Sequence, residues 1–110
     1  MPKFATFFTF KGETINAYIE RPSDRAAAVR KLLEGVNGKL ESYYWMFGPY
    51  DGFIVTDMPD SMSAAAVSLA VASTGGFAHL ETHELFTADQ LAPLVAKAKA
   101  ARGAYKAPGT

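Results

Sequence analysis

The chain contains no cysteine. Disulfide frameworks, thiolate zinc sites and cysteine nucleophiles are therefore excluded. It also lacks a block of one charge, because its 11 basic and 11 acidic residues balance and are dispersed along the sequence. Nonspecific nucleic-acid binding depends on a dense basic surface. We therefore expect no nucleic-acid partner.

Long apolar runs are missing as well. The first residues, MPKFATFFTF, contain neither the apolar core nor the small-residue cleavage site of an export signal. The longest stretch with few charges, residues 61–78, is rich in Ala, Ser and Gly and ends in Gly75-Gly76. This composition predicts a buried helix and its stop, not a membrane span. We expect a cytoplasmic protein with no membrane partner.

Several catalytic motifs are absent: the sequence has no Walker loop, GxGxxG, GxSxG or HExxH. Enzymes that depend on those motifs are excluded. The chain has 110 residues, about half of them apolar, which predicts one ordinary core. We expect a single domain over residues 1–102, with a closing helix at about 88–102, and a flexible tail over residues 103–110.

The most informative stretch is residues 43–60, YYWMFGPYDGFIVTDMPD. Its apolar residues predict a strand over 43–47 and a second strand over 53–56. Between them, residues 48–52 combine glycine, proline and an Asp-Gly pair, which all favour chain reversal. The stretch therefore predicts an antiparallel hairpin at the centre of the fold.

The residues before this hairpin predict a strand, a loop and a helix. Residues 3–10 alternate so that both faces of the strand are apolar. A loop is expected over 13–20, and Pro22 suits the first turn of a helix. That helix has one apolar stripe and ends at Gly35 and Asn37-Gly38. The stripe comprises Val29, Leu32, Leu33 and Val36. We expect Arg25, Arg30 and Lys31 to lie in water on the outer face.

The residues after the hairpin predict a helix, a strand and a second helix. Asp60 is a natural N-cap for a helix over 61–74, and residues 77–87 alternate as a strand does. Residues 87–90 match a capping box, and Pro93 indicates that the last helix is broken or starts late. In that helix we expect Leu91, Leu94, Val95 and Ala98 to face inward.

This order of elements is β-α-β-β-α-β plus a terminal helix, an α+β fold of the ferredoxin-like type. In that topology two helices cover one face of the sheet and leave the other bare. Apolar side chains on the bare face would form a patch larger than monomers tolerate. We therefore expect the chain to pair with itself through the sheet face, as a homodimer of the dimeric α/β-barrel type.

A set of short motifs resembles the GYD domain family, small bacterial and archaeal proteins named for a Gly-Tyr-Asp motif. The resemblance covers residues 3–87. The matching motifs are Thr9-Phe10-Lys11-Gly12, the helix containing Arg25, Gly38-Lys39-Leu40, Tyr44-Trp45, Gly48-Pro49-Tyr50-Asp51, Pro59-Asp60 and Glu81-Thr82 with Phe86-Thr87. The resemblance implies the dimeric α/β barrel but no established reaction. Pro49 stands where family members often carry an acidic residue.

His79, Glu81 and His83 share one face of the predicted strand over 77–87. Imidazole and carboxylate are ligands for Zn, Fe(II), Mn or Ni. A strand rises about 3.3 Å per residue, so His79 and His83 are roughly 13 Å apart and too distant to share an ion. Only a neighbouring pair could share a metal, completed by other strands or a partner. We favour ordinary polar histidines, and we expect no metal and no cofactor.

Aromatic and acidic residues of the hairpin supply further candidates. Tyr50 and Asp51 could form an acid–base pair over a pocket, although Asp51 capping the turn while Tyr50 packs on the sheet explains them more simply. Tyr43, Tyr44 and Trp45 could line an aromatic pocket for a planar ligand or haem. Core and dimer packing explain these three residues more simply.

Together these features predict a homodimeric protein that binds a small molecule in or at the mouth of the barrel. The candidate ligand-binding residues are Tyr43, Trp45, Tyr50, Asp51, His79 and His83. The alternative is a cofactor-free or metal-assisted enzyme of the monooxygenase or isomerase type, which rests on fold analogy alone. The sequence identifies no catalytic residue.

Overall fold

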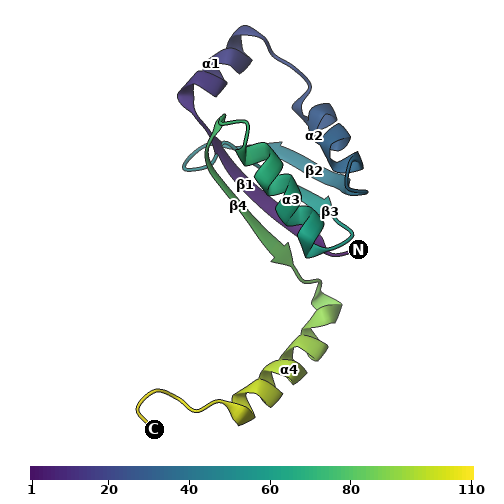
Figure 1. Cartoon of the computed structure of the whole chain (residues 1–110), viewed down its shortest axis with the longest axis vertical. Coiled ribbons are helices and arrows are strands. Elements are labelled where there is room, and N and C mark those ends of the chain that lie inside the picture. Colours follow the sequence, from purple (N-terminus) through teal and green to yellow (C-terminus); the bar gives the residue numbers. More distant parts are fainter.

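The computed structural model describes all 110 residues as a mixed α+β fold (Figure 1). Four antiparallel strands form one open sheet in the order β2-β3-β1-β4. The elements in chain order are β1 (Lys3–Phe10), α1 (Gly12–Glu20), α2 (Arg25–Glu34), β2 (Lys39–Trp45), β3 (Gly52–Asp57), α3 (Ser61–Ala72), β4 (Phe77–Leu85), the 3-10 turn η1 (Ala88–Gln90) and α4 (Leu91–Ala104).

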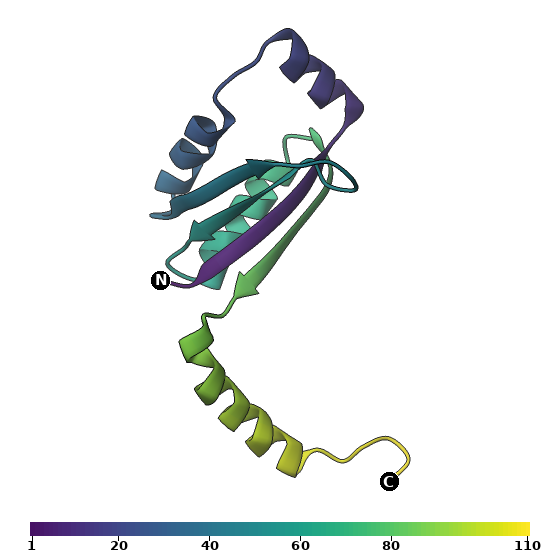
Figure 2. The same ribbon diagram turned by 180° about the vertical axis from the view of Figure 1, so that it is seen from behind.

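Cross-strand register decides which side chains face the helices. Phe4 pairs with Thr56, and Thr6 pairs with both Ile54 and Thr82. Because side chains alternate along a strand, these residues share one face, which α2 and α3 cover. Lys3, Ala5, Phe7 and Thr9 of β1 therefore lie on the opposite side, which we call the open face. Figure 2 views the sheet from this side.

Helices α2 and α3 begin where side chains satisfy their first N–H groups. The Asp24 carboxylate accepts from Ala27 N–H at the start of α2, and the Asp60 carboxylate accepts from Ser63 N–H at 2.7 Å at the start of α3. The expected cap at Asp60 is therefore confirmed. Leu33 of α2 and Met58 are almost fully buried against Phe4 and Ala64, and these four residues form the core cluster.

One predicted loop is wrong, because residues 12–20 form helix α1. Ile15, Tyr18 and Ile19 recur at helical spacing and give this short segment an apolar stripe. Tyr18 packs on Trp45 with ring centroids 5.3 Å apart, which anchors α1 over the end of the sheet. Helix α2 begins at Arg25, three residues later than the Pro22 start that the sequence predicted.

The strand predicted over residues 43–47 is displaced. Strand β2 begins at Lys39 and ends at Trp45, so Met46 and Phe47 belong to the turn, and Phe47 is completely exposed. The register of β2 against β3 shifts between Leu40 and Ser42. This bulge turns Tyr43 toward the helices, whereas Tyr44 faces the open side.

The expected inward packing of the last helix is wrong for the single chain. The capping box is present, with Gln90 Oε1 accepting from Thr87 N–H, but α4 then projects away from the sheet (Figure 1). Leu91, Leu94 and Val95 are 59%, 40% and 52% exposed. Within the chain no sheet or helix lies against this face of α4. No helix in the structure has the length and apolar character needed to cross a membrane.

Candidate functional site

The hairpin turn is fixed to the end of β1. Asp51 accepts from Phe10 N–H through Oδ2 at 2.8 Å, and its own N–H donates to Phe8 O at 2.8 Å. Thr9 Oγ1 donates to Pro49 O at 2.6 Å. The β1–β4 register slips at Thr9/Phe10, so Asp51 satisfies a backbone N–H beside that bulge. The aspartate of the Gly-Pro-Tyr-Asp-Gly stretch thus holds the turn in place.

Two glycines make this turn possible. Gly48 has a φ of 108°, a conformation that other residues adopt only with strain. At Gly52, a Cβ atom would lie 2.6 Å from Tyr44 O and 2.7 Å from the Phe8 ring, so only glycine fits between them. The geometry directs Tyr50 across the open face, where its ring packs on Phe7 with centroids 5.4 Å apart.

Glu81 is the centre of a polar cluster on the open face. Its Oε1 accepts a 2.6 Å hydrogen bond from the Tyr50 hydroxyl and lies 2.8 Å from His79 Nε2. Its Oε2 lies 2.6 Å from His83 Nε2. We call these four residues the Glu81 cluster. It joins the hairpin turn to both histidines of the chain through one carboxylate.

These contacts shift two acid–base equilibria in opposite directions. Hydrogen bonds from Tyr50, His83 and His79 lower the pKa of Glu81 to about 2. The hydrogen bond to the Glu81 carboxylate, aided by partial burial, raises the pKa of Tyr50. Near neutral pH the cluster therefore contains an ionised carboxylate and a protonated phenol.

The ionised carboxylate also determines the histidine tautomers. A carboxylate only accepts hydrogen bonds, so both Nε2 atoms must carry the shared protons. In its neutral form each imidazole then has an unprotonated Nδ1, which is an acceptor. The histidine side chains are more than half exposed. When both imidazoles are neutral, the cluster thus has two ring acceptors on the open face.

An aromatic row leads across the sheet to this cluster. Tyr44 stacks on Phe53 at 5.3 Å, and Phe53 stacks on Phe7 at 5.4 Å. Phe7 is in turn the cross-strand partner of Glu81. The open face therefore combines flat apolar rings with acceptor groups at one end. This arrangement suits a small planar molecule that carries hydrogen-bond donors.

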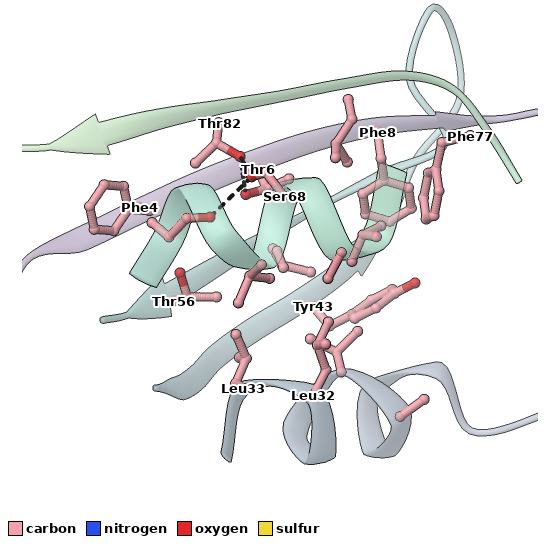
Figure 3. A pocket seen from close by; sticks show the side chains of 18 of the residues that line it. Phe4, Thr6, Phe8, Leu32, Leu33, Tyr43, Thr56, Ser68, Phe77 and Thr82 are labelled. Carbon is pink, nitrogen blue, oxygen red and sulfur yellow. Dashed lines mark hydrogen bonds between the residues drawn. The ribbon is translucent and has the colours of Figure 1, made fainter. Parts of the chain in front are cut away.

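The structure divides the sequence-predicted ligand-binding residues between the two faces of the sheet. Tyr50, His79 and His83 meet at Glu81 on the open face. Tyr43 and Trp45 lie on the helix-covered side, where their rings are 5.7 Å apart (Tyr43 is labelled in Figure 3). Asp51 makes backbone contacts in the turn and does not contact the cluster.

The cluster does not form a metal site within one chain. No group of three His, Cys, Asp or Glu side chains is arranged to hold an ion. Both histidines direct Nε2 at the carboxylate that would have to be the third ligand.

The sequence predicted one candidate side chain wrongly and did not indicate others. Arg25, expected in water, is half-buried and lines a cavity under the helices. The aromatic row and the link from Tyr50 to Glu81 were also missed. Alternation along each strand shows only which residues of that strand share a face with Phe7, Phe53 or Glu81. The pairing of the strands, however, is needed to align them.

The fold and the Glu81 cluster define a small α+β domain with a four-stranded antiparallel sheet and one face open. Residues 4–95 match the family profile described as the GYD domain. The chain belongs to this family. The resemblance read from the sequence is thereby confirmed, and the match continues into α4.

A comparison with curated proteins gives no match. Among solved structures, the chain is similar to the crystal structure of TTHA0845 from Thermus thermophilus. The TM-score is 0.52 at 19% identity, covering 80% of this chain and 96% of the other. At this identity the likeness concerns the fold alone.

Proposed function

We propose that the protein is a homodimer that binds a small planar molecule over the open face, at the Glu81 cluster. The observation that carries the proposal is the convergence of Tyr50, His79 and His83 on one carboxylate at the end of an aromatic row. The strand order β2-β3-β1-β4 supports a ferredoxin-like subunit. Two such subunits would enclose the site if their open faces met as a barrel.

The surface of the single chain supports a dimer. The chain exposes 7767 Å², whereas a folded monomer of 11.8 kDa exposes about 5,900 Å². The excess of roughly 1,900 Å² per chain, or about 3,800 Å² for two chains, lies within the range of about 2,000–5,000 Å² that obligate dimers bury. The radius of gyration is 17.6 Å, against about 13 Å for a compact domain of this length. The open face and α4 account for unpartnered surface of this kind.

The proposed ligand follows from the groups that face it. The rings of Phe7 and Phe53 offer flat contact area, and the histidine Nδ1 atoms accept hydrogen bonds. Small aromatic molecules with N–H or O–H groups, such as indoles, phenols and aminopurines, match both features. A strong acid matches poorly, because the Glu81 carboxylate would repel its anion.

The test is a titration of the full-length protein with a panel of such molecules, followed by NMR chemical shifts. Perturbations should gather at Tyr50, His79 and His83 and be lost in Glu81→Gln. The matched control is Glu84→Gln, because Glu84 lies on the same strand but faces the helix-covered side, bonded to Ser61. Mass spectrometry of the purified protein should detect a co-purified molecule of the same class. Shifts confined to α2, with none at the cluster, would contradict the proposal.

A second candidate function is acid–base catalysis without a cofactor. The fixed histidine tautomers favour it, since the unprotonated Nδ1 of a neutral imidazole can take a proton from a bound molecule. Incubation with each ligand that binds, followed by product analysis, separates the two functions. Conversion of a ligand by the wild type, but not by His79→Gln or His83→Gln, would identify catalysis. Recovery of intact ligand from the wild type would indicate binding alone.

A further inference from the structure

A second site lies on the other side of the sheet. A cavity of about 260 Å³ runs between the sheet and helices α2 and α3 (Figure 3). It is lined by 22 residues, of which 16 are hydrophobic. Ligand pockets are typically about 300–1,000 Å³, so this cavity would admit a small or slender molecule.

The positions of the helices explain why this space is open. Helix α2 packs over the edge strand β2, and α3 packs over the opposite edge strand β4. The central strands β3 and β1 lie between them. The α3 residues that face the cavity are no larger than valine, and three of them, Ala64, Ser68 and Ala70, are small, so they do not fill the gap. Core packing rarely leaves a void of this size unoccupied.

The cavity is elongated and has unlike ends. Phe4, Leu33 and Met58 are buried and close one end with apolar groups. Arg25, the first residue of α2, and Tyr43 line it as well. Arg25 and Leu33 are eight residues apart on one helix, which separates them by about 12 Å. Phe4 and Phe77 likewise lie toward opposite ends in Figure 3.

Arg25 is the one charged residue in the lining, and its side chain forms no ion pair or hydrogen bond within the chain. The remaining polar side chains are hydroxyls. Thr82 Oγ1 lies 2.9 Å from Thr6 Oγ1 and 3.1 Å from Ser68 Oγ, so these three hydroxyls satisfy one another along the wall. Burial raises the pKa of Tyr43 to about 12, which keeps its phenol neutral beside Arg25.

We propose that this cavity binds a straight-chain carboxylate, with the carboxylate on Arg25 and the acyl chain extended toward Leu33 and Met58. A half-buried guanidinium without a partner favours an anion, and carboxylates match its planar fork of donors. A slender apolar tail matches the remaining length of the cavity, from Arg25 toward Leu33. This site is separate from the Glu81 cluster, because the sheet lies between the two.

The test is isothermal titration of the full-length, delipidated protein with octanoate, decanoate and 1-octanol. Octanoate should bind one molecule per chain and perturb the resonances of Tyr43 and Phe77. Two added methylenes should tighten binding about tenfold. Octanol should bind at least tenfold more weakly than octanoate because it lacks the charge.

Variants separate the recognition of the charge from that of the tail. Arg25→Gln should weaken octanoate at least tenfold and leave octanol unchanged, whereas Arg25→Lys should restore most of the loss. The matched control is Arg30→Gln, because Arg30 is on the same helix, exposed and outside the cavity lining. Val67→Phe should weaken both probes by filling the cavity. Circular dichroism establishes that each variant is folded.

Three results would overturn the proposal. Equal binding of octanoate and octanol, unaffected by Arg25→Gln, would show that Arg25 does not recognise the carboxylate. Intermolecular NOEs from Leu94 or Val95 to Val67 would show instead that the α4 helix of a second copy occupies the cavity. Shifts at Tyr50 and His79 without shifts at Tyr43 would assign the probes to the open face.

Discussion

The Tyr50 hydroxyl donates a 2.6 Å hydrogen bond to Glu81 and thereby ties the β2–β3 turn to the edge strand β4. The bond crosses over β1, where the Tyr50 ring packs on Phe7. Because Asp51 fixes the same turn to Phe10 N–H, the tyrosine is held from both sides. The tyrosine and the aspartate of the motif therefore have different roles: one reaches the site and the other holds the loop that presents it.

Removing the Tyr50 hydroxyl should change the ionisation of Glu81. In Tyr50→Phe the largest cause of the lowered pKa is lost, so we expect the pKa of Glu81 to rise from about 2 toward 4.5. A carboxylate-detected NMR titration measures this shift. Tyr44→Phe is the control, because Tyr44 lies on the same face at the far end of the aromatic row. An unchanged pKa in Tyr50→Phe would show that the histidines alone hold it low.

The Glu81 cluster also predicts how stability falls in acid. The folded-state pKa of Glu81 is below its ordinary value of 4.5. Its contribution is therefore fully present above pH 4.5 and is lost as pH falls toward 2. Urea unfolding across this window should show a steeper loss for the wild type than for Glu81→Gln. Equal slopes would mean that the carboxylate does not stabilise the fold.

The loss of stability at alkaline pH should depend on Tyr43. Its folded-state pKa is about 12, against an ordinary value of 10.0. Its contribution is fully present below pH 10 and is lost as pH rises toward 12, because the unfolded chain releases its proton first. Phenolate absorbance should show two late-titrating tyrosines, Tyr43 and Tyr50. Only the transition of Tyr43 should disappear in Tyr43→Phe. A spectrum in which all tyrosines ionise together near their ordinary pKa would contradict this expectation.

Self-association should depend on the open face. The wild type should have a light-scattering mass near twice 11.8 kDa, and Phe7→Glu should shift it toward the monomer, since a charge there would be buried in the interface. Met62→Glu is the control, because Met62 is 82% exposed on α3, across the sheet. A monomeric wild type at micromolar concentration would eliminate the barrel.

The glycines of the chain should differ in their tolerance of alanine. At Gly52 a Cβ would meet the Tyr44 carbonyl oxygen, so Gly52→Ala should lower the free energy of unfolding by about 1–3 kcal/mol. At Gly12 nothing lies within 4 Å, and alanine there should be neutral or stabilise by up to about 1 kcal/mol. Denaturant unfolding of both variants measures the difference. Equal effects would show that the turn relaxes around the added methyl.

Local chemistry made much of the fold predictable. Strand 3–10, the cap at Asp60 and the capping box at Thr87 follow from residues close together in sequence, and the structure confirms all three. Helix α1 was missed because Ile15 and Ile19 are β-branched, which lowers helix propensity. Its stabilising contact, Tyr18 on Trp45, joins distant parts of the chain.

The site was only partly predictable, because strand pairing decides which side chains meet on one face of the sheet. The bulge in β2 puts Glu41 between residues that pair with neighbours on β3, and this reverses the faces of Tyr43 and Tyr44. No local pattern indicates that reversal. The wrong expectation for α4 has a related cause, since an apolar face predicts burial without saying whether the same chain supplies the partner.

The alternation of apolar and ionisable side chains along β4 also disfavours a wrong register of this strand. Leu80 and Thr82 face the helices, whereas His79, Glu81 and His83 face away from them. A slip of one residue against β1 would bring all three ionisable groups beneath α3 and leave the leucine in water. An edge strand is held on one side only, so it is the strand most free to slip. The groups proposed to receive a ligand would thus also penalise the wrong alignment of the strand that carries them.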